Sequence, residues 1–227
     1  MCRKAISRLG VASAMLLAAA YAYAESPMNV DDAGALDKGG MKIEGVWQKD
    51  DKHISGALLF GFSPVDHLEI ELGATRDNDM SANPAIKSHG FGVGLKWVPY
   101  QNELGWSLGA RFDYGQNLAE IGTEHVYELA GLASFRFENG HVLHMNAGRA
   151  HLETPGEHVT AWTWGAGYEL PLAQGLQVTA EIFGEGGSGP DKAIGLRHEI
   201  FDGFKVSAAI GQGNDRSFGQ AGFAWEF

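Results

Sequence analysis

The chain ends on residues Ser217 to Phe227, SFGQAGFAWEF in one-letter code. Counted back from the carboxyl terminus, every second position holds one of the apolar residues Phe227, Trp225, Phe223 and Ala221, and three of these are aromatic. The residues between them are small or polar: Glu226, Ala224, Gly222 and Gln220. Because successive side chains of an extended strand point to opposite faces, this stretch predicts a strand with one oily and one polar face. That pattern is typical of a lipid-facing strand in a transmembrane β-barrel.

The aromatic end of this strand also resembles the C-terminal assembly signal of bacterial outer-membrane proteins. The residues that carry the resemblance are Phe223, Trp225 and Phe227. The resemblance implies that the barrel-assembly machinery is a partner and recognises the C-terminal strand.

The amino-terminal end predicts export. Arg3, Lys4 and Arg8 precede the apolar run 9–20, and Ala22-Tyr23-Ala24 follows it. This order of a basic region, an apolar region and a small-x-small site is that of a secretory signal peptide, and we expect cleavage after Ala24. A membrane anchor is the alternative, but the run is shorter than the ~20 apolar residues that a spanning helix needs.

The sequence therefore divides into three parts. Residues 1–24 are predicted to be a cleaved signal peptide, residues 25–39 a periplasmic N-terminal leader, and residues 40–227 the transmembrane β-barrel. The predicted location is the bacterial outer membrane, with its lipids and lipopolysaccharide as partners. Whether the leader folds into the barrel stays open at this point.

Composition excludes several classes of function. The chain has 17 Lys+Arg and 28 Asp+Glu, and three of the bases lie in the signal, so the mature chain has 17 − 3 = 14 bases, 28 acids and a formal charge of −14. Such acidity argues against nucleic acid as a partner. The single cysteine, Cys2, leaves with the signal, so we expect no disulfide, thiolate ligand or thiol nucleophile in the exported protein.

Segments of about ten residues with period-two alternation recur along the mature chain, as in membrane barrels. They predict an all-β fold, an antiparallel up-and-down transmembrane β-barrel of twelve strands, with ten or fourteen as alternatives. The predicted strands start at Met41, Ile54, His67, His89, Trp106, His125, His141, His158, Leu176, Ala193, Phe204 and Phe218.

The connections alternate in predicted length. Residues 64–66, 138–140, 171–175 and 202–203 contain the Pro, Asn-Gly and Asp-Gly signals of tight turns. Longer connections are predicted at 77–87, 117–124, 153–157 and 184–191. Short connections on one side and long ones on the other match periplasmic turns and outer loops.

The volume of the side chains on each face decides which face of the sheet meets lipid. A soluble barrel would turn its oily face inward, and a soluble sandwich is a second alternative. The aromatic side chains of the oily face would overfill a small barrel, whereas glycines, serines and charges fit inside easily. We therefore assign to the lipid face Trp47, Phe60, Phe62, Trp97, Trp106, Phe112, Phe135, Trp162, Trp164, Tyr168 and Trp225.

The other face then lines a lumen. Its six bases are Lys42, Lys96, Arg111, Arg136, Arg197 and Lys205. Its ten acids are Glu44, Glu69, Glu71, Asp113, Glu128, Glu169, Glu181, Glu185, Glu199 and Glu226. The acidic excess predicts a mild cation preference if water passes. The same charges can instead pair across the barrel and close it, and the sequence leaves both alternatives open.

No catalytic, cofactor-binding or metal-binding residue is predicted. His141 and His144 are three apart on a strand, so they face opposite sides and cannot share a metal. Ser88 and His89 are adjacent and oppose each other in the same way, which disfavours an outer-membrane lipid hydrolase. A triad assembled from distant strands stays an alternative.

Six histidines are predicted near strand starts. They predict either a pH-sensitive rim or amphipathic side chains suited to the headgroup zone, and the second is favoured. The six are His53, His67, His89, His125, His141 and His158.

The leader and first strand resemble a known family. The acidic pair Asp31-Asp32, then Gly34, then Lys38-Gly39 leading into an alternating strand, is similar to the opening of outer-membrane proteins of the MetA-pathway of phenol degradation family. The turn and strand 64–69 resemble that family's repeated turn. The resemblance implies passage of small, aromatic or hydrophobic molecules across the outer membrane.

Two functions from different classes stay open. One is a passive channel or transporter for small solutes. The other is a closed structural or surface-interaction barrel that works through its outer loops, 77–87 and 184–191 above all.

Overall fold

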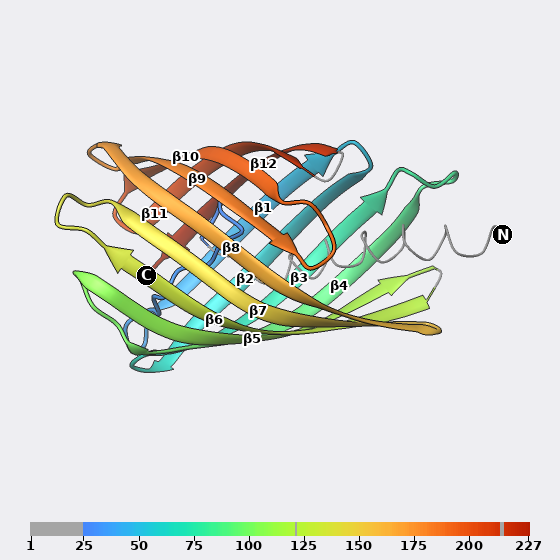
Figure 1. Cartoon of the computed structure of the whole chain (residues 1–227), viewed down its shortest axis with the longest axis horizontal. Helices are drawn as coiled ribbons and strands as arrows, with labels where there is room; N and C mark the ends of the chain where they lie inside the picture. The colour runs from blue at the N-terminus through green and yellow to red at the C-terminus, as the bar shows by residue number, and fades with distance from the viewer. Residues whose placement is uncertain (1–24, 121, 214–215) are drawn as a thin grey trace.

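The described residues of the computed structural model are 25–120, 122–213 and 216–227. They form twelve antiparallel strands, each hydrogen-bonded to its neighbours in sequence, and the first also pairs with the last, so the sheet closes into a barrel (Figure 1). The predicted all-β fold of twelve strands is confirmed. The strands are β1 (Met41–Asp50), β2 (His53–Val65), β3 (Leu68–Asp79), β4 (Ile86–Tyr100), β5 (Gly105–Ala119), β6 (Gly122–Arg136), β7 (Val142–Thr154), β8 (Glu157–Ala173), β9 (Leu176–Glu185), β10 (Asp191–Phe201), β11 (Phe204–Gly213) and β12 (Arg216–Glu226).

The C-terminal strand completes the ring. β12 pairs with β1 from Lys42 opposite Glu226 to Asp50 opposite Phe218. The Met41 amide donates to the Phe227 carbonyl at 2.8 Å, and the Phe227 amide donates to the Met41 carbonyl at 2.9 Å. A closed ring leaves no strand edge unpaired, which is the condition for placing strands in lipid. Residues Met41 and Phe227 lie at the same end of the barrel. We call this end the periplasmic end, after the orientation expected of outer-membrane barrels, and the opposite end the outer end.

Strand starts lie within three residues of those predicted, with instructive differences. His67 lies in the turn before β3, with a left-handed φ of 68°, because the tight β2–β3 turn needs a positive φ at this position. His141 lies just before β7. The six histidines also divide between the two ends of the barrel: His67 and His141 lie at the periplasmic end, and the other four at the outer end. They therefore do not form one rim.

The predicted contrast between short and long connections holds only in part, because two of the four predicted long outer connections have only two residues. The β7 and β8 strands pair to Thr154 opposite Glu157, so only Pro155-Gly156 joins them, and β5 and β6 pair to Ala119 opposite Gly122. The outer connections contract because hairpin pairing continues through the turn-rich residues. Six residues still join β3 to β4 and five join β9 to β10. At the periplasmic end, four residues join β4 to β5.

The faces of the sheet follow the predicted alternation. Large apolar side chains are exposed on the outside, and Trp162 reaches 66% exposure. Inward positions are polar, small or glycine, but they also include a few apolar side chains, such as buried Phe218, Leu132 and Leu152. Leu152 and Leu132 belong to two small separate apolar clusters, and the buried apolar side chains do not form one core. Among the described residues, no helix has the length and apolarity to cross a bilayer.

Candidate functional site

The leader runs inside the barrel. Figure 1 shows this segment, in blue, within the ring of strands toward the periplasmic end. It contacts inward side chains from widely separated strands: Lys96 on β4, Ser134 on β6, Glu181 on β9 and Ser207 on β11. Contacts on opposite walls mean that the leader crosses the lumen, and they decide the question that the sequence left open.

A central charge cluster holds the acidic pair of the leader. The Lys96 ammonium lies 2.8 Å from Asp31 Oδ1 and 2.8 Å from Asp32 Oδ1. The Arg111 guanidinium contacts Asp31 at 3.2 Å, and Arg136 reaches Asp32 at 3.4 Å. Lys96, Arg111 and Asp31 are almost fully buried. The leader therefore supplies counter-charges to bases that project from β4, β5 and β6.

The same cluster continues along the wall of β1, β3 and β5. Arg111 Nε lies 2.8 Å from Asp113, and its Nη2 donates to Glu71. The Lys42 ammonium lies 2.7 Å from Glu69 and 2.6 Å from Glu71. The Glu44 carboxylate also lies 3.4 Å from the Lys42 ammonium. These groups are 2–8% exposed at the side chain, so water screens their interaction weakly.

A second cluster, the N-terminal clamp, consists of Arg197 and Lys205. Arg197 Nε donates to the Ser26 carbonyl at 2.9 Å, and Arg197 Nη2 donates to the Glu25 carbonyl. Lys205 Nζ lies 2.6 Å from the Glu25 carboxylate. Arg197 also donates to Glu169. The two bases therefore bind both the backbone and the side chain of the first described residue.

Further hydrogen bonds fix the leader between the two clusters. The amides of Asn29 and Val30 donate to Glu181 Oε2 at 2.7 and 3.0 Å. The side chain of Asn146 both accepts from and donates to the Asp31 backbone, at 2.7 and 2.8 Å. The Ala33 amide donates to the Ser134 hydroxyl at 2.7 Å. Backbone groups that have left water are therefore satisfied by side chains of the wall.

The wall is reduced to glycine where the leader lies against it. A Cβ atom added at Gly165 would lie 2.7 Å from Val30 Cγ2, and one added at Gly195 would lie 2.8 Å from Pro27 Cγ. Either distance is shorter than van der Waals contact. A larger residue at these positions would occupy the space that the leader fills.

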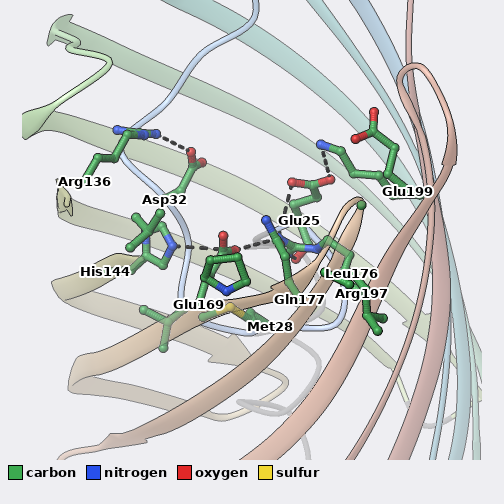
Figure 2. Close-up of a pocket in the computed structure, with 16 residues that line it drawn as sticks. Glu25, Met28, Asp32, Arg136, His144, Glu169, Leu176, Gln177, Arg197 and Glu199 are labelled. Atoms are coloured by element: carbon green, nitrogen blue, oxygen red, sulfur yellow. Dashed lines mark hydrogen bonds and ion pairs between the residues drawn. The ribbon is translucent and has the colours of Figure 1, made fainter. Parts of the chain in front are cut away.

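Two cavities flank the leader. One, of about 350 Å³, lies between Glu25 and Asp32 of the leader and the side chains of Arg136, Glu169 and Arg197, as Figure 2 shows. The other, of about 420 Å³, is lined by leader residues 35–37 and by turn residues 101–103. The leader therefore narrows the periplasmic mouth without filling it.

The charge of Asp32 is strongly stabilised. Burial opposes its ionisation, but the Lys96 ammonium, which also hydrogen-bonds to it, and the Arg136 guanidinium outweigh burial and hold the pKa of Asp32 well below its usual range. The carboxylate therefore stays charged near neutral pH.

The structure brings most of the sequence-predicted lumen residues into these two clusters and the contacts between them. Glu128 lies apart and accepts from Thr163 at 2.7 Å. Glu199 lies exposed at the periplasmic end, where it accepts from the Gly203 amide at 3.0 Å. The predicted assembly-signal residues Phe223, Trp225 and Phe227 are exposed on the outer face of β12 and beside it.

Sequence reasoning missed the leader's own contribution and several neutral wall residues. Asn146, Ser134 and Ser207 occupy inward positions of their strands, so the same alternation could have selected them. The Asp31-Asp32 pair had no visible partner, because its bases come from three strands that are distant in sequence.

The side chains of the pairs His141/His144 and Ser88/His89 point to opposite faces of the sheet, as the alternation along a strand requires. His144 is buried and accepts or donates a hydrogen bond with Ser134 at 2.8 Å, whereas His141 contacts the Tyr168 hydroxyl at 2.6 Å at the surface. Ser88 is buried and its neighbour His89 is exposed. Neither pair can act on one ligand.

Taken together, these contacts make the leader a non-covalent plug. An interior built from about eight strands is filled by its own side chains, and one built from about sixteen leaves an aqueous channel. Twelve strands lie between these limits. The residual space here is filled in part by residues 25–39, the segment that precedes β1.

Solved structures with similar folds are outer-membrane barrels. The COG4313 outer membrane channel from Pseudomonas putida F1 superposes with a TM-score of 0.69 at 10% identity, covering 86% of this chain and 98% of that chain. The KdgM porin gives 0.60 at 12% identity, with 82% and 99% covered. The NanC porin gives 0.58 at 8% identity, with 82% and 98% covered. At these identities the likeness establishes the fold of a bacterial outer-membrane barrel.

Sequence comparison identifies the family. No curated protein matches the chain. Nothing in the comparisons supports the resemblance to the MetA-pathway of phenol degradation family. The chain belongs instead to the family described as "Uncharacterised conserved protein UCP029691", which matches it over residues 12–215.

Proposed function

We propose that this protein is a passive outer-membrane channel for small polar solutes, and that its leader closes the lumen and must move for solutes to pass. The observation that carries the proposal is the binding of residues 25–39 across the lumen by side chains of the wall. The porin and channel folds of the solved relatives are in line with this role.

The character of the contacts favours a leader that can move. Most of them are ion pairs and hydrogen bonds, which water can replace when the segment leaves. Full apolar burial in the leader is limited to four small or medium side chains: Pro27, Met28, Val30 and Ala33. A permanently closed barrel could fill its lumen with bulky side chains of its own wall. This wall instead has Gly165 and Gly195 beside the leader, so the leader fills that space.

Two alternatives receive less support. A surface-interaction barrel that works through its outer loops is disfavoured because even the two outer connections on which it would rely have only six residues, 80–85, and five residues, 186–190. Passage of aromatic or hydrophobic solutes is disfavoured because Lys96, Arg111 and Arg197 project into the path of the lumen. We therefore propose polar rather than aromatic solutes.

A disulfide lock tests the proposal directly. The hydroxyl oxygens of Ser26 on the leader and Ser207 on β11 are 2.8 Å apart, and the exported chain is predicted to lack cysteine. In the double variant Ser26→Cys/Ser207→Cys, a disulfide would tie the leader to the wall. Single-channel recordings in planar bilayers should show few openings when it is oxidised and wild-type openings after reduction.

Matched controls separate the lock from general damage. Ser26→Cys and Ser207→Cys alone should respond weakly to oxidant, because neither can form the bond. A variant without residues 25–38, fused directly after the signal, should conduct continuously. If the oxidised double variant conducts as well as the reduced one, the leader does not gate the pore. If the deleted variant folds but never conducts, the barrel is closed by its wall.

A further inference from the structure

A compact group of metal-ligand side chains lies on the outer surface of the barrel, away from the leader. His151 and Glu153 are two residues apart on β7, so their side chains share one face. In the β7–β8 register, Glu153 lies opposite His158, and His151 lies opposite Thr160. The intervening Leu152 is buried on the inward side. The group therefore faces outward, beside the connection at the outer end.

The donor atoms are already close together. His151 Nε2 lies 3.4 Å from Glu153 Oε1, and His158 Nδ1 lies 3.9 Å from the same oxygen. One ligand atom from each of the three residues falls within 4.8 Å of the others. The two imidazole rings are parallel, with an interplanar angle of 2° and centroids 6.1 Å apart. A zinc ion with bonds of about 2.0–2.1 Å needs ligand atoms about 3.3 Å apart in tetrahedral geometry.

We propose that His151, Glu153 and His158 form a binding site for a divalent transition-metal ion such as Zn²⁺. Two imidazoles and one carboxylate suit zinc and its neighbours in the transition series, whereas Mg²⁺ and Ca²⁺ prefer oxygen ligands alone. Three protein ligands leave a fourth tetrahedral position, which is open to the outside.

A fourth residue orients the first ligand. His151 Nδ1 and Thr160 Oγ1 are 2.7 Å apart. When the threonine oxygen accepts the Nδ1 proton, the lone pair of the imidazole is placed on Nε2, the atom that faces Glu153. Outer contacts of this kind are a regular feature of histidines that bind metals. Thr160 therefore acts as a positioning residue.

The site is accessible to ions. The side chains of His151 and Glu153 are 39% and 37% exposed, and that of His158 is 68% exposed. Arg149 is the basic residue nearest in sequence to His151. Its guanidinium lies over the Trp162 ring, 5.6 Å from the centroid, and this contact occupies it. The site is independent of the leader and of the proposed channel function.

Zinc titration of the purified full-length mature barrel, without a histidine tag and after chelator treatment, tests the proposal. Isothermal titration calorimetry in detergent should give one site per chain, and Co²⁺ should give the visible absorption of a four-coordinate complex. His151→Ala, Glu153→Gln and His158→Ala should each weaken zinc binding at least tenfold. His89→Ala, which removes an exposed histidine from the same end, should leave it unchanged.

The positioning role has its own readout. Thr160→Val should weaken zinc binding about 10- to 100-fold while one ion per chain still binds. All substituted side chains are on the surface, and heat-modifiable migration in electrophoresis checks that each variant remains folded. The proposal is overturned if the wild-type barrel binds no zinc, or if the double variant His151→Ala/His158→Ala binds it as tightly as the wild type.

Discussion

Single residues decide whether the leader fits the lumen. At Gly165 the missing side chain provides the space that Val30 occupies, whereas a Cβ at Gly73 would meet only Leu59 Cγ at an ordinary distance of 3.8 Å. Both glycines face inward, and the sequence pattern alone cannot distinguish them. Their different surroundings make them a matched pair for substitution.

Gly165→Val is therefore expected to expel the leader. The added methyl groups would overlap Val30, and the polar contacts of the segment cannot form once its backbone shifts. Planar-bilayer recordings should show more frequent openings than in the wild type. Gly73→Val should leave the frequency of openings unchanged. Equal effects of the two substitutions would contradict the proposed contact between Gly165 and Val30.

Arg111 is the residue on which the central charge cluster depends. It is 2% exposed and contacts Glu71, Asp113 and Asp31. Removing one partner of a buried ion pair typically costs ~3–5 kcal/mol, because the remaining charges stay buried without compensation.

Arg111→Met should accordingly lower the free energy of unfolding by about that amount, measured by urea titration of the barrel in lipid vesicles. Arg149→Met provides the control, since Arg149 is an exposed arginine that rests on Trp162. We expect it to cost less than about 1 kcal/mol. Similar losses for the two variants would show that the buried cluster adds nothing to stability.

At the scale of elements, β12 has two roles that can be separated. Its backbone closes the barrel against β1, and its outer face carries Phe223 and Trp225, with Phe227 immediately after the strand. Closure depends on the backbone, whereas the assembly signal proposed from the sequence depends on the aromatic side chains.

Phe227→Ser keeps the backbone and removes the terminal aromatic ring. If the ring serves recognition by the assembly machinery, the variant should fold in detergent like the wild type but reach the outer membrane at a much lower level. Fractionation and quantitative immunoblotting measure that level. Phe201→Ser, at the exposed end of β10, is the control for loss of an aromatic ring. Normal amounts of the Phe227 variant would remove the assembly role.

At the scale of the whole molecule, binding of the leader in the lumen depends on pH through the charge of Asp32. The pKa of Asp32 is lowered when the leader is bound, so its contribution to binding is fully present above its ordinary value of 3.8. That contribution is lost progressively as the pH falls below 3.8 toward the lowered pKa. Asp32 should thus keep its full contribution to leader binding throughout the neutral range.

Channel openings should therefore increase as the pH falls below about 4, where Asp32 starts to lose its charge. Planar-bilayer recordings at a series of pH values check this. Asp32→Asn should open more often at neutral pH and should lose part of the acid response. A lower frequency of openings at acidic pH would contradict the effect expected from Asp32.

Much of the fold was predictable because it rests on local rules. Alternation along each strand assigns Trp162 outward and Arg111 inward without knowledge of any partner. The outer connections were predicted as too long, since turn residues such as Pro155-Gly156 mark where a chain turns and do not show how far pairing continues. His67 was placed in a strand because a positive φ at a histidine has no sequence signal.

The sequence by itself determined that a closed ring of strands carries aromatic groups outside and charges inside, because side-chain direction in a strand depends only on position along it. Only the tertiary structure decided that the leader occupies the lumen and that the wall glycines fit it. The same holds for His151, Glu153 and His158, which converge through pairing of two strands. Such contacts depend on the register and closure of the barrel, and period-two alternation contains no information about which distant residues meet.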